Sequence, residues 1–174
     1  IPFEIIVSDI DESYPTHLAI EAVPEFIAKN KAQAVHEKIK LGYPQHINKH
    51  IVAADTIVVL EGNILGKPAN KAEAIASLSA LSGKTHRVIT GVVLIYNGKE
   101  YTFSETTLVT FNLLTLDQIE YYVENYKPYD KAGGYAIQEW IGVVGIQSIQ
   151  GDFYNVMGLP VSKLLQKIKQ LEEA

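Results

Sequence analysis

The sequence contains no cysteine among its 174 residues. This absence excludes a disulfide framework, a zinc site with thiolate ligands and redox chemistry by cysteine. It agrees with a protein of the reducing cytoplasm. The sequence also lacks any apolar run near the roughly 20 residues that span a bilayer, and it shows no signal peptide. We therefore expect a soluble, cytoplasmic protein with no membrane partner.

Basic charge is scarce as well, because 15 lysines and arginines face 20 acidic residues, which gives a formal net charge of −5. A protein of this charge has no overall positive field that attracts nucleic acid, so we expect no nucleic-acid partner. Any polyanionic ligand has to be held by a local group of lysines. With 47% hydrophobic residues and no repeat, low-complexity tract or linker, the chain is expected to form a single domain over residues 1–174.

The central feature is the run from Val52 to Leu60, which is apolar and rich in β-branched residues apart from Asp55 and Thr56. Such a run predicts a buried strand, in which polar side chains need partners. The following turn at Gly66-Lys67-Pro68 lets the chain fold back and offers a lysine to the Asp55 carboxylate. The alternative is structural: Asp55 caps a helix or pairs with a lysine that supports the fold.

Periodicity and turn residues predict the other elements. Asn97-Gly98 predicts a hairpin turn. Thr85, His86, Thr90, Thr106 and Thr107 of this hairpin are interpreted as routine edge residues of a sheet. Asn70-Lys71-Ala72-Glu73 and Thr115-Leu116-Asp117-Gln118 have the form of capping boxes. The expected elements are a strand at 3–7, helices at 24–41, 70–82, 115–125 and 161–173, a hairpin at 86–111 and strands at 143–149.

Two further stretches offer groups that suit a phosphorylated ligand. Lys31 lies in the apolar stripe of the 24–41 helix, where a lysine either extends to the rim or binds a buried phosphate. In the glycine-rich loop at 127–138, Lys131 and Gln138 provide a cation and an amide, which are complementary to a phosphate and to a base edge. The alternative for this loop is a simple turn.

Five motifs in register resemble the Maf family across nearly the whole chain. They are Ala53-Ala54-Asp55-Thr56, Gly66-Lys67-Pro68, Leu81-Ser82-Gly83-Lys84-Thr85-His86, Asp130-Lys131-Ala132-Gly133-Gly134-Tyr135-Ala136-Ile137-Gln138 and Asn155-Val156-Met157-Gly158-Leu159-Pro160. The resemblance implies a nucleoside triphosphate pyrophosphatase with an α/β (mixed α+β) fold. That fold is an elongated, twisted mixed sheet flanked by helices, similar to inosine triphosphate pyrophosphatases, with a cleft between two lobes. A homodimer is also implied.

The same resemblance assigns roles to individual residues. Asp55 is the implied proton acceptor, and Thr56 and Gln138 are the implied specificity positions. Lys31, Lys67 and Lys131 are implied to line the triphosphate pocket. The family's N-terminal Ser-x-Ser-Pro-Arg-Arg element, which binds phosphate, has no counterpart here, and Asn30 stands where many members have Glu. Because Ile1 is followed directly by a predicted strand, we expect the natural N-terminus to have been lost or trimmed.

Hydrolysis between the α and β phosphates needs an attacking water and neutralisation of the charge on a polyanion. A divalent cation, Mg²⁺ or Mn²⁺, is therefore expected as cofactor, with Asp55 as its ligand or as the base; the sequence leaves both roles open. With Thr56 and Gln138 at these positions, the sequence resembles the subgroup of the family that hydrolyses the pyrimidine nucleotides dTTP and UTP. A primary amide both donates and accepts, which suits O4 and N3–H of uracil or thymine.

Two other functions remain open at the level of sequence. One is a non-catalytic nucleotide-binding or regulatory protein linked to septum formation. The other is a phosphatase of the haloacid-dehalogenase type that uses Asp9 and Asp11 after the predicted 3–7 strand, although the Gly-Thr that usually follows this motif is replaced by Glu12-Ser13.

Overall fold

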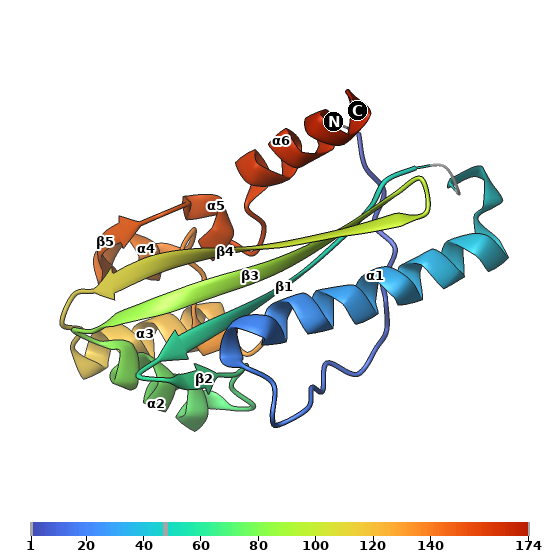
Figure 1. Cartoon of the computed structure of the whole chain (residues 1–174). Coiled ribbons are helices and arrows are strands. Elements are labelled where there is room, and N and C mark those ends of the chain that lie inside the picture. The colour runs from blue at the N-terminus through green and yellow to red at the C-terminus, as the bar shows by residue number, and fades with distance from the viewer. Residues whose placement is uncertain (1, 47–48, 174) are drawn as a thin grey trace. The chain divides into compact units, whose positions relative to one another are not determined.

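The computed structural model describes residues 2–46 and 49–173 (Figure 1). Helices and strands are interspersed along the chain. The strands are β1 (Ile51–Leu60), β2 (Asn63–Leu65), β3 (Thr85–Tyr96), β4 (Lys99–Phe111) and β5 (Ile146–Gln150). The α-helices are α1 (Val23–Gly42), α2 (Lys71–Leu81), α3 (Leu116–Tyr126), α4 (Trp140–Gly145), α5 (Phe153–Val156) and α6 (Val161–Glu172). Short 3₁₀ turns lie at Ile20–Ala22, Pro44–His46 and Ala132–Gly134.

The five strands form one sheet in the order β2-β1-β3-β4-β5. Pairing is antiparallel at both ends of this order, where β1 pairs with β2 and β4 with β5. The long hairpin of β3 and β4 turns at Asn97 and Gly98, whose φ angles of 49° and 72° are those of a tight hairpin turn. The predicted α/β (mixed α+β) fold with a sheet flanked by helices is therefore confirmed.

The chain divides into two compact units. The first unit comprises residues 1–55, 91–104 and 166–174, and the second comprises residues 56–90 and 105–165. Each unit has its own apolar core, so each is described by itself below. The expectation of a single domain over 1–174, and that of a cleft between two lobes, stay predictions.

In the first unit, α1 packs through small residues. Ala28 and Ala32 share a core with Ile39 of the same helix and with Ile51, Val93 and Ile95 of the strands. Gly91 in β3 lies directly under the start of α1, where an added Cβ would be 2.3 Å from the backbone nitrogen of Glu25. A side chain at position 91 is thus sterically excluded, and this contact fixes the N-terminal end of α1.

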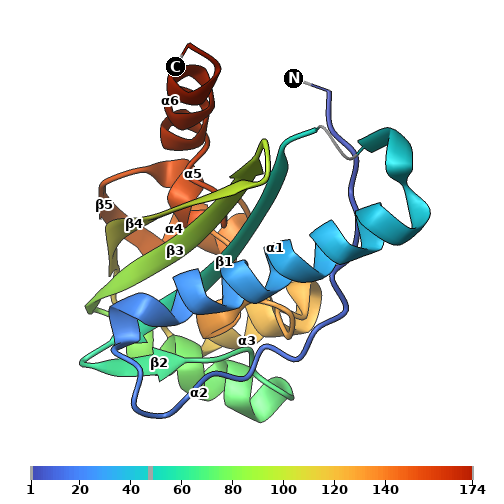
Figure 2. The same ribbon diagram turned by 45° about the vertical axis from the view of Figure 1, so that its right-hand side comes forward.

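In the second unit, α2 and α3 lie side by side in both views (Figures 1 and 2). The predicted capping box at Thr115 forms, and at Asn70 the predicted N-cap bond forms. The Asn70 side chain accepts a hydrogen bond from Glu73 N, and the Thr115 and Gln118 side chains bond reciprocally to the backbone. The helices pack on a core that includes Leu78, Phe111 and the fully buried Tyr122.

The four long helices lie within one residue of their predicted bounds at each end. Two strand predictions were wrong. Residues 3–7 form no strand within the described chain, and Phe3, Ile5 and Val7 are exposed, so this apolar segment has no sheet to join. Residues 143–145 belong to α4, and only the part from Ile146 onward is a strand. Among the described residues, no helix is long and apolar enough to cross a membrane.

Candidate active site

Asp55 lies in the middle of β1, and its carboxylate is bound by Lys31 of α1. The Lys31 Nζ atom is 2.7 Å from Asp55 Oδ1 and 2.7 Å from Glu12 Oε1. The side chains of Asp55 and Lys31 are 10% and 19% exposed, whereas that of Glu12 is 40% exposed. One partly buried ammonium group is therefore shared by two carboxylates, in a geometry that gives strong, charge-assisted hydrogen bonds.

The pKa of Lys31 reflects this environment. Burial alone lowers the pKa of its ammonium group, but the hydrogen bonds and charges of Asp55 and Glu12 outweigh burial and raise it above the usual 10.5. Lys31 therefore stays protonated at neutral pH. Its position in the apolar stripe of α1 does not reflect simple extension to the rim, because the charged end is held by two acids.

Glu12 is a member of this cluster that the sequence did not reveal. The sequence placed it in an acidic turn beside Asp9 and Asp11, and no short-range pattern links it to Lys31. The structure also places Lys31 on Asp55, a pairing that the turn at 66–68 did not suggest, and the approach of Lys67 to this carboxylate stays a prediction. Both contacts join elements distant in the chain, which explains why local pattern gave no signal.

The donor set of this cluster fits a divalent cation. No group of three or more His, Asp or Glu side chains suited to a metal occurs within the described chain. However, Mg²⁺ usually takes one or two protein carboxylates and completes its shell with water and substrate phosphates. Asp55 and Glu12 both bind the Lys31 ammonium group, so their carboxylate oxygens also suit a hard cation next to Lys31.

Thr56, the next residue of β1, belongs to a polar network in the second unit. Its Oγ1 lies 2.8 Å from Thr90 Oγ1 and 3.5 Å from the carbonyl oxygen of Gly158. Thr90 Oγ1 donates to the Asn155 carbonyl oxygen at 3.1 Å. Each hydroxyl has one proton, so either threonine can be the donor of the hydrogen bond between them, and Thr56 Oγ1 keeps at least one lone pair as an acceptor in both cases.

Asn155 continues this network. Its Nδ2 donates to the Val88 carbonyl and to Thr107 Oγ1, and Thr107 Oγ1 is bonded to the backbone of Asp152. Thr90, Thr107 and Asn155 are all fully buried. The interpretation of these threonines as routine edge residues was wrong. Thr90 and Thr107 join the Asn155–Pro160 motif to the sheet, because their strands, β3 and β4, each have a neighbouring strand on both sides.

Lys67 and Lys131 both lie near Asp130. The Lys131 ammonium is 2.7 Å from Asp130 Oδ2, and this hydrogen bond, together with the charge of Lys67, lowers the pKa of the Asp130 carboxyl. The two lysine-bearing loops are joined by a hydrogen bond of 3.1 Å from Gly133 N to Gly66 O. Two predicted phosphate-binding lysines are thus brought together around one exposed acid.

Gly133 permits the close backbone approach that its motif predicts. Its φ angle is 69°, and an added Cβ would lie 3.0 Å from Val58 Cγ1. The loop therefore packs directly on β1. Gln138, at the end of this loop, is exposed, while Tyr135, Ala136 and Ile137 before it are buried.

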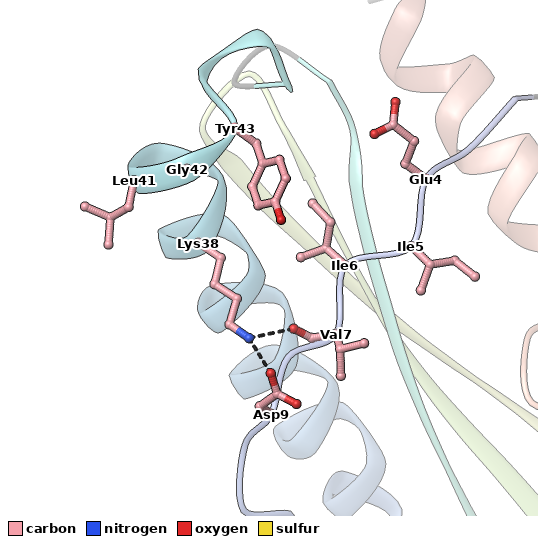
Figure 3. Close-up of a pocket in the computed structure, with 9 residues that line it drawn as sticks. All are labelled: Glu4, Ile5, Ile6, Val7, Asp9, Lys38, Leu41, Gly42 and Tyr43. Carbon is pink, nitrogen blue, oxygen red and sulfur yellow. Dashed lines mark hydrogen bonds and ion pairs between the residues drawn. The ribbon is translucent and has the colours of Figure 1, made fainter.

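Asp9 and Asp11 do not form a comparable site. Lys38 donates to Asp9 Oδ2 at 2.6 Å and to the Val7 carbonyl at 2.9 Å, and these contacts border a hollow of about 570 Å³ (Figure 3). Asp11 accepts from the backbone of Ser13. The strand that a haloacid-dehalogenase motif follows is missing here, so the structure gives that alternative no support.

Sequence comparisons give a consistent result. A model of the family described as Maf-like protein matches residues 1–171. A protein of Parabacteroides distasonis named dTTP/UTP pyrophosphatase is 48% identical over 170 residues, which cover 97% of this chain and 85% of the relative. Relatives with the same name in Bacteroides fragilis and Cytophaga hutchinsonii are 49% and 47% identical, over 94% and 98% of this chain and 81% and 75% of the relatives.

Proposed function

The chain belongs to the Maf family, and from this premise we propose that it hydrolyses dTTP and UTP to the nucleoside monophosphate and pyrophosphate. The observation that supports this reaction is the partly buried cluster in which Lys31 is held at 2.7 Å by both Asp55 and Glu12. A base that takes a proton from the attacking water and a cation that stabilises the developing charge both promote hydrolysis of a phosphoanhydride.

In this proposal, Asp55 accepts the proton of the water that attacks the α-phosphate, and pyrophosphate leaves with the electrons of the broken P–O bond. Lys31 stabilises the negative charge that develops on the phosphate oxygens. Asp55 and Glu12 would hold a Mg²⁺ or Mn²⁺ ion, which neutralises phosphate charge when bound. Lys67 and Lys131 bind the phosphate chain as point charges.

Thr56 and Gln138 are proposed to recognise the base. Gln138 has an exposed amide that can donate to O4 and accept from N3–H of uracil or thymine, and cytosine inverts this pair of groups. Thr56 Oγ1 keeps at least one lone pair as an acceptor. A mispaired amide costs about 1–3 kcal/mol, so dTTP and UTP should exceed CTP in kcat/KM by roughly 5-fold to 150-fold.

The first experiment identifies the products. The purified protein is incubated with each triphosphate and Mg²⁺, and phosphate products are separated by ion-exchange chromatography. We expect pyrophosphate and the monophosphate from dTTP and UTP. Release of orthophosphate, preference for purine triphosphates, or binding without turnover would each exclude the proposed reaction.

The second experiment tests the base site. Gln138→Glu replaces the amide donor with a carboxylate, which cannot donate to O4 but accepts from the cytosine amino group. We expect the dTTP to CTP ratio of kcat/KM to fall. Gln147→Glu, at an exposed position of β5, adds the same charge away from the 127–138 loop and should leave the ratio intact.

A homodimer is part of the same proposal and is supported by resemblance to the family. Sedimentation equilibrium over a wide concentration range measures it directly. A species with the mass of one 19.3 kDa chain at every concentration would contradict it.

A further inference from the structure

Gln138 occupies the exposed tip of a turn whose flanking residues are buried. Glu139 N donates to Ala136 O at 3.1 Å, which closes a four-residue turn over residues 136–139, referred to below as the 136–139 turn. Gln138 is exposed, whereas Ala136 and Ile137 are buried. The backbone of this turn therefore sets the place from which the Gln138 side chain extends.

A single buried hydroxyl holds both ends of the turn. Tyr122 in α3 is 0% exposed. Its phenol oxygen accepts a hydrogen bond of 3.1 Å from Ala136 N, and its proton is donated to Glu139 Oε2 at 2.5 Å. Because one oxygen contacts residues on both sides of Gln138, it fixes the spacing of the two ends and anchors them to α3.

Neighbouring contacts show that the turn is fixed to the core on several sides. Gly142 of α4 lies against the same turn, where an added Cβ would be 1.7 Å from the Ile137 carbonyl oxygen. Before the turn, Tyr135 OH lies 2.7 Å from Nε2 of the buried His86. Within the described chain, the Glu139 carboxylate makes no capping bond to α4, although Glu139 is its N-cap residue. Its Oε2 accepts instead from the Tyr122 hydroxyl.

We propose that Tyr122 is a positioning residue for base specificity: its hydroxyl orients the 136–139 turn so that the Gln138 amide meets the pyrimidine edge. This inference rests on the proposed function. Tyr122 itself contacts no substrate in this account, because its side chain is fully buried. An ordinary core tyrosine would contribute to folding stability only, so base selectivity separates the two roles.

The test compares Tyr122→Phe with Tyr126→Phe. Both replacements remove one hydroxyl from α3, and the two rings are stacked with centroids 5.0 Å apart, but Tyr126 is exposed. In Tyr122→Phe the Ala136 amide and the Glu139 carboxylate lose their shared partner. We expect the dTTP to CTP ratio of kcat/KM to fall about 10-fold, mostly through a higher KM for dTTP. Tyr126→Phe should keep the wild-type ratio.

A double-mutant cycle tests whether Tyr122 acts through Gln138. In the Gln138→Ala background, Tyr122→Phe should cause no further change in the ratio. An unchanged ratio in the single variant, or a full effect that persists without Gln138, would overturn the proposal. Glu139→Ala removes one of the two contacts at a half-buried position and should lower the ratio in the same direction, so the proposal can be tested even where Tyr122→Phe folds poorly.

The wild-type protein separates this inference from the proposed function. If it hydrolyses no nucleoside triphosphate, the proposed function fails, and if it prefers dTTP while Tyr122→Phe keeps that preference, only the positioning role fails. Calorimetric binding of dTMP and CMP to the same variants gives a readout without turnover. Equal binding of the two monophosphates by the wild-type protein would contradict base recognition at Gln138 and the role of Tyr122 with it.

Discussion

At the scale of single residues, the charge balance around Lys31 has a clear chemical consequence. Asp55→Asn keeps the size of the side chain but removes the negative charge and the basicity, while Glu12 still holds Lys31. We therefore predict a folded protein whose kcat for dTTP falls about 10²-fold or more, the usual scale for a positioned base. Steady-state kinetics of pyrophosphate release measures this directly.

Glu100→Gln is the matched control for this variant. Glu100 of β4 forms an ion pair of 2.7 Å with Lys29 of α1, and both side chains are more exposed than those of Lys31 and Asp55. Glu100→Gln should leave kcat unchanged, because exposed ion pairs contribute little to folding stability. Normal turnover in Asp55→Asn would assign Asp55 to structure, the alternative that the sequence left open.

His86 predicts a specific pH dependence of stability. The imidazole is 2% exposed, and burial lowers its pKa from 6.5 to about 4. Between these pH values the unfolded chain binds a proton at His86 that the folded chain does not bind. The free energy of unfolding therefore rises as the pH increases from about 4 to 6.5, and it decreases as the pH falls through the same window. At 1.36 kcal/mol per pKa unit, the contribution is about 3 kcal/mol.

His86→Gln should remove this contribution because an amide does not titrate. We predict that the wild-type protein loses about 3 kcal/mol more than the variant between pH 6.5 and pH 4, as measured by urea unfolding at each pH. His17→Gln, which removes an exposed imidazole, should behave like the wild type. Parallel pH profiles for wild type and His86→Gln would show that His86 does not titrate as a buried group.

At the scale of elements, the contact between β3 and the start of α1 depends on a missing side chain. Gly91→Ala would place a Cβ 2.3 Å from Glu25 N and 2.4 Å from the Pro24 carbonyl carbon. Backbone atoms cannot turn aside as a flexible side chain does, so α1 has to shift. We predict a loss of about 1–3 kcal/mol or more in the free energy of unfolding, measured by chemical denaturation.

Gly42→Ala is the control for this prediction. Gly42 is the last residue of α1, and an added Cβ there meets no described heavy atom within 4 Å. Its stability should be equal to or above that of the wild type, since alanine restricts the unfolded chain and favours helix. Equal denaturation midpoints for Gly91→Ala and Gly42→Ala would contradict the packing described for the first unit.

Element boundaries were predictable where the signal is local. The Asn97-Gly98 turn, the N-cap bond at Asn70 and the capping box at Thr115 form as their sequences predict, because each depends on residues at most three positions apart. The apolar pattern at 3–7 failed, because a strand also needs a neighbouring strand to satisfy its backbone, and that requirement is not local.

At the scale of the whole molecule, net charge predicts dependence on a divalent cation. A protein with net charge −5 and a triphosphate repel each other at long range, and the 20 acidic residues outnumber the 15 basic ones. We predict that a chelator abolishes hydrolysis of dTTP and that added Mg²⁺ or Mn²⁺ restores it. Chelator already saturated with Mg²⁺ is the control, and full turnover in metal-free solution would contradict this dependence.

The sequence by itself determined the family, the helices and the hairpin, because motif spacing, helical periodicity and turn residues are properties of neighbouring positions. It also singled out Asp55, Lys31, Lys67, Lys131, Thr56 and Gln138 as site residues, and their catalytic and binding roles stay predictions. The comparisons confirmed the family.

Only the tertiary structure decided which groups are partners. Lys31 binds both Glu12 and Asp55, Tyr122 joins Ala136 to Glu139, and buried threonines hold the Asn155 segment. Each contact joins positions far apart along the chain. These contacts form because a buried polar group needs a hydrogen-bond partner. Sequence spacing does not encode that partner, because the path of the chain through the sheet brings the two groups together.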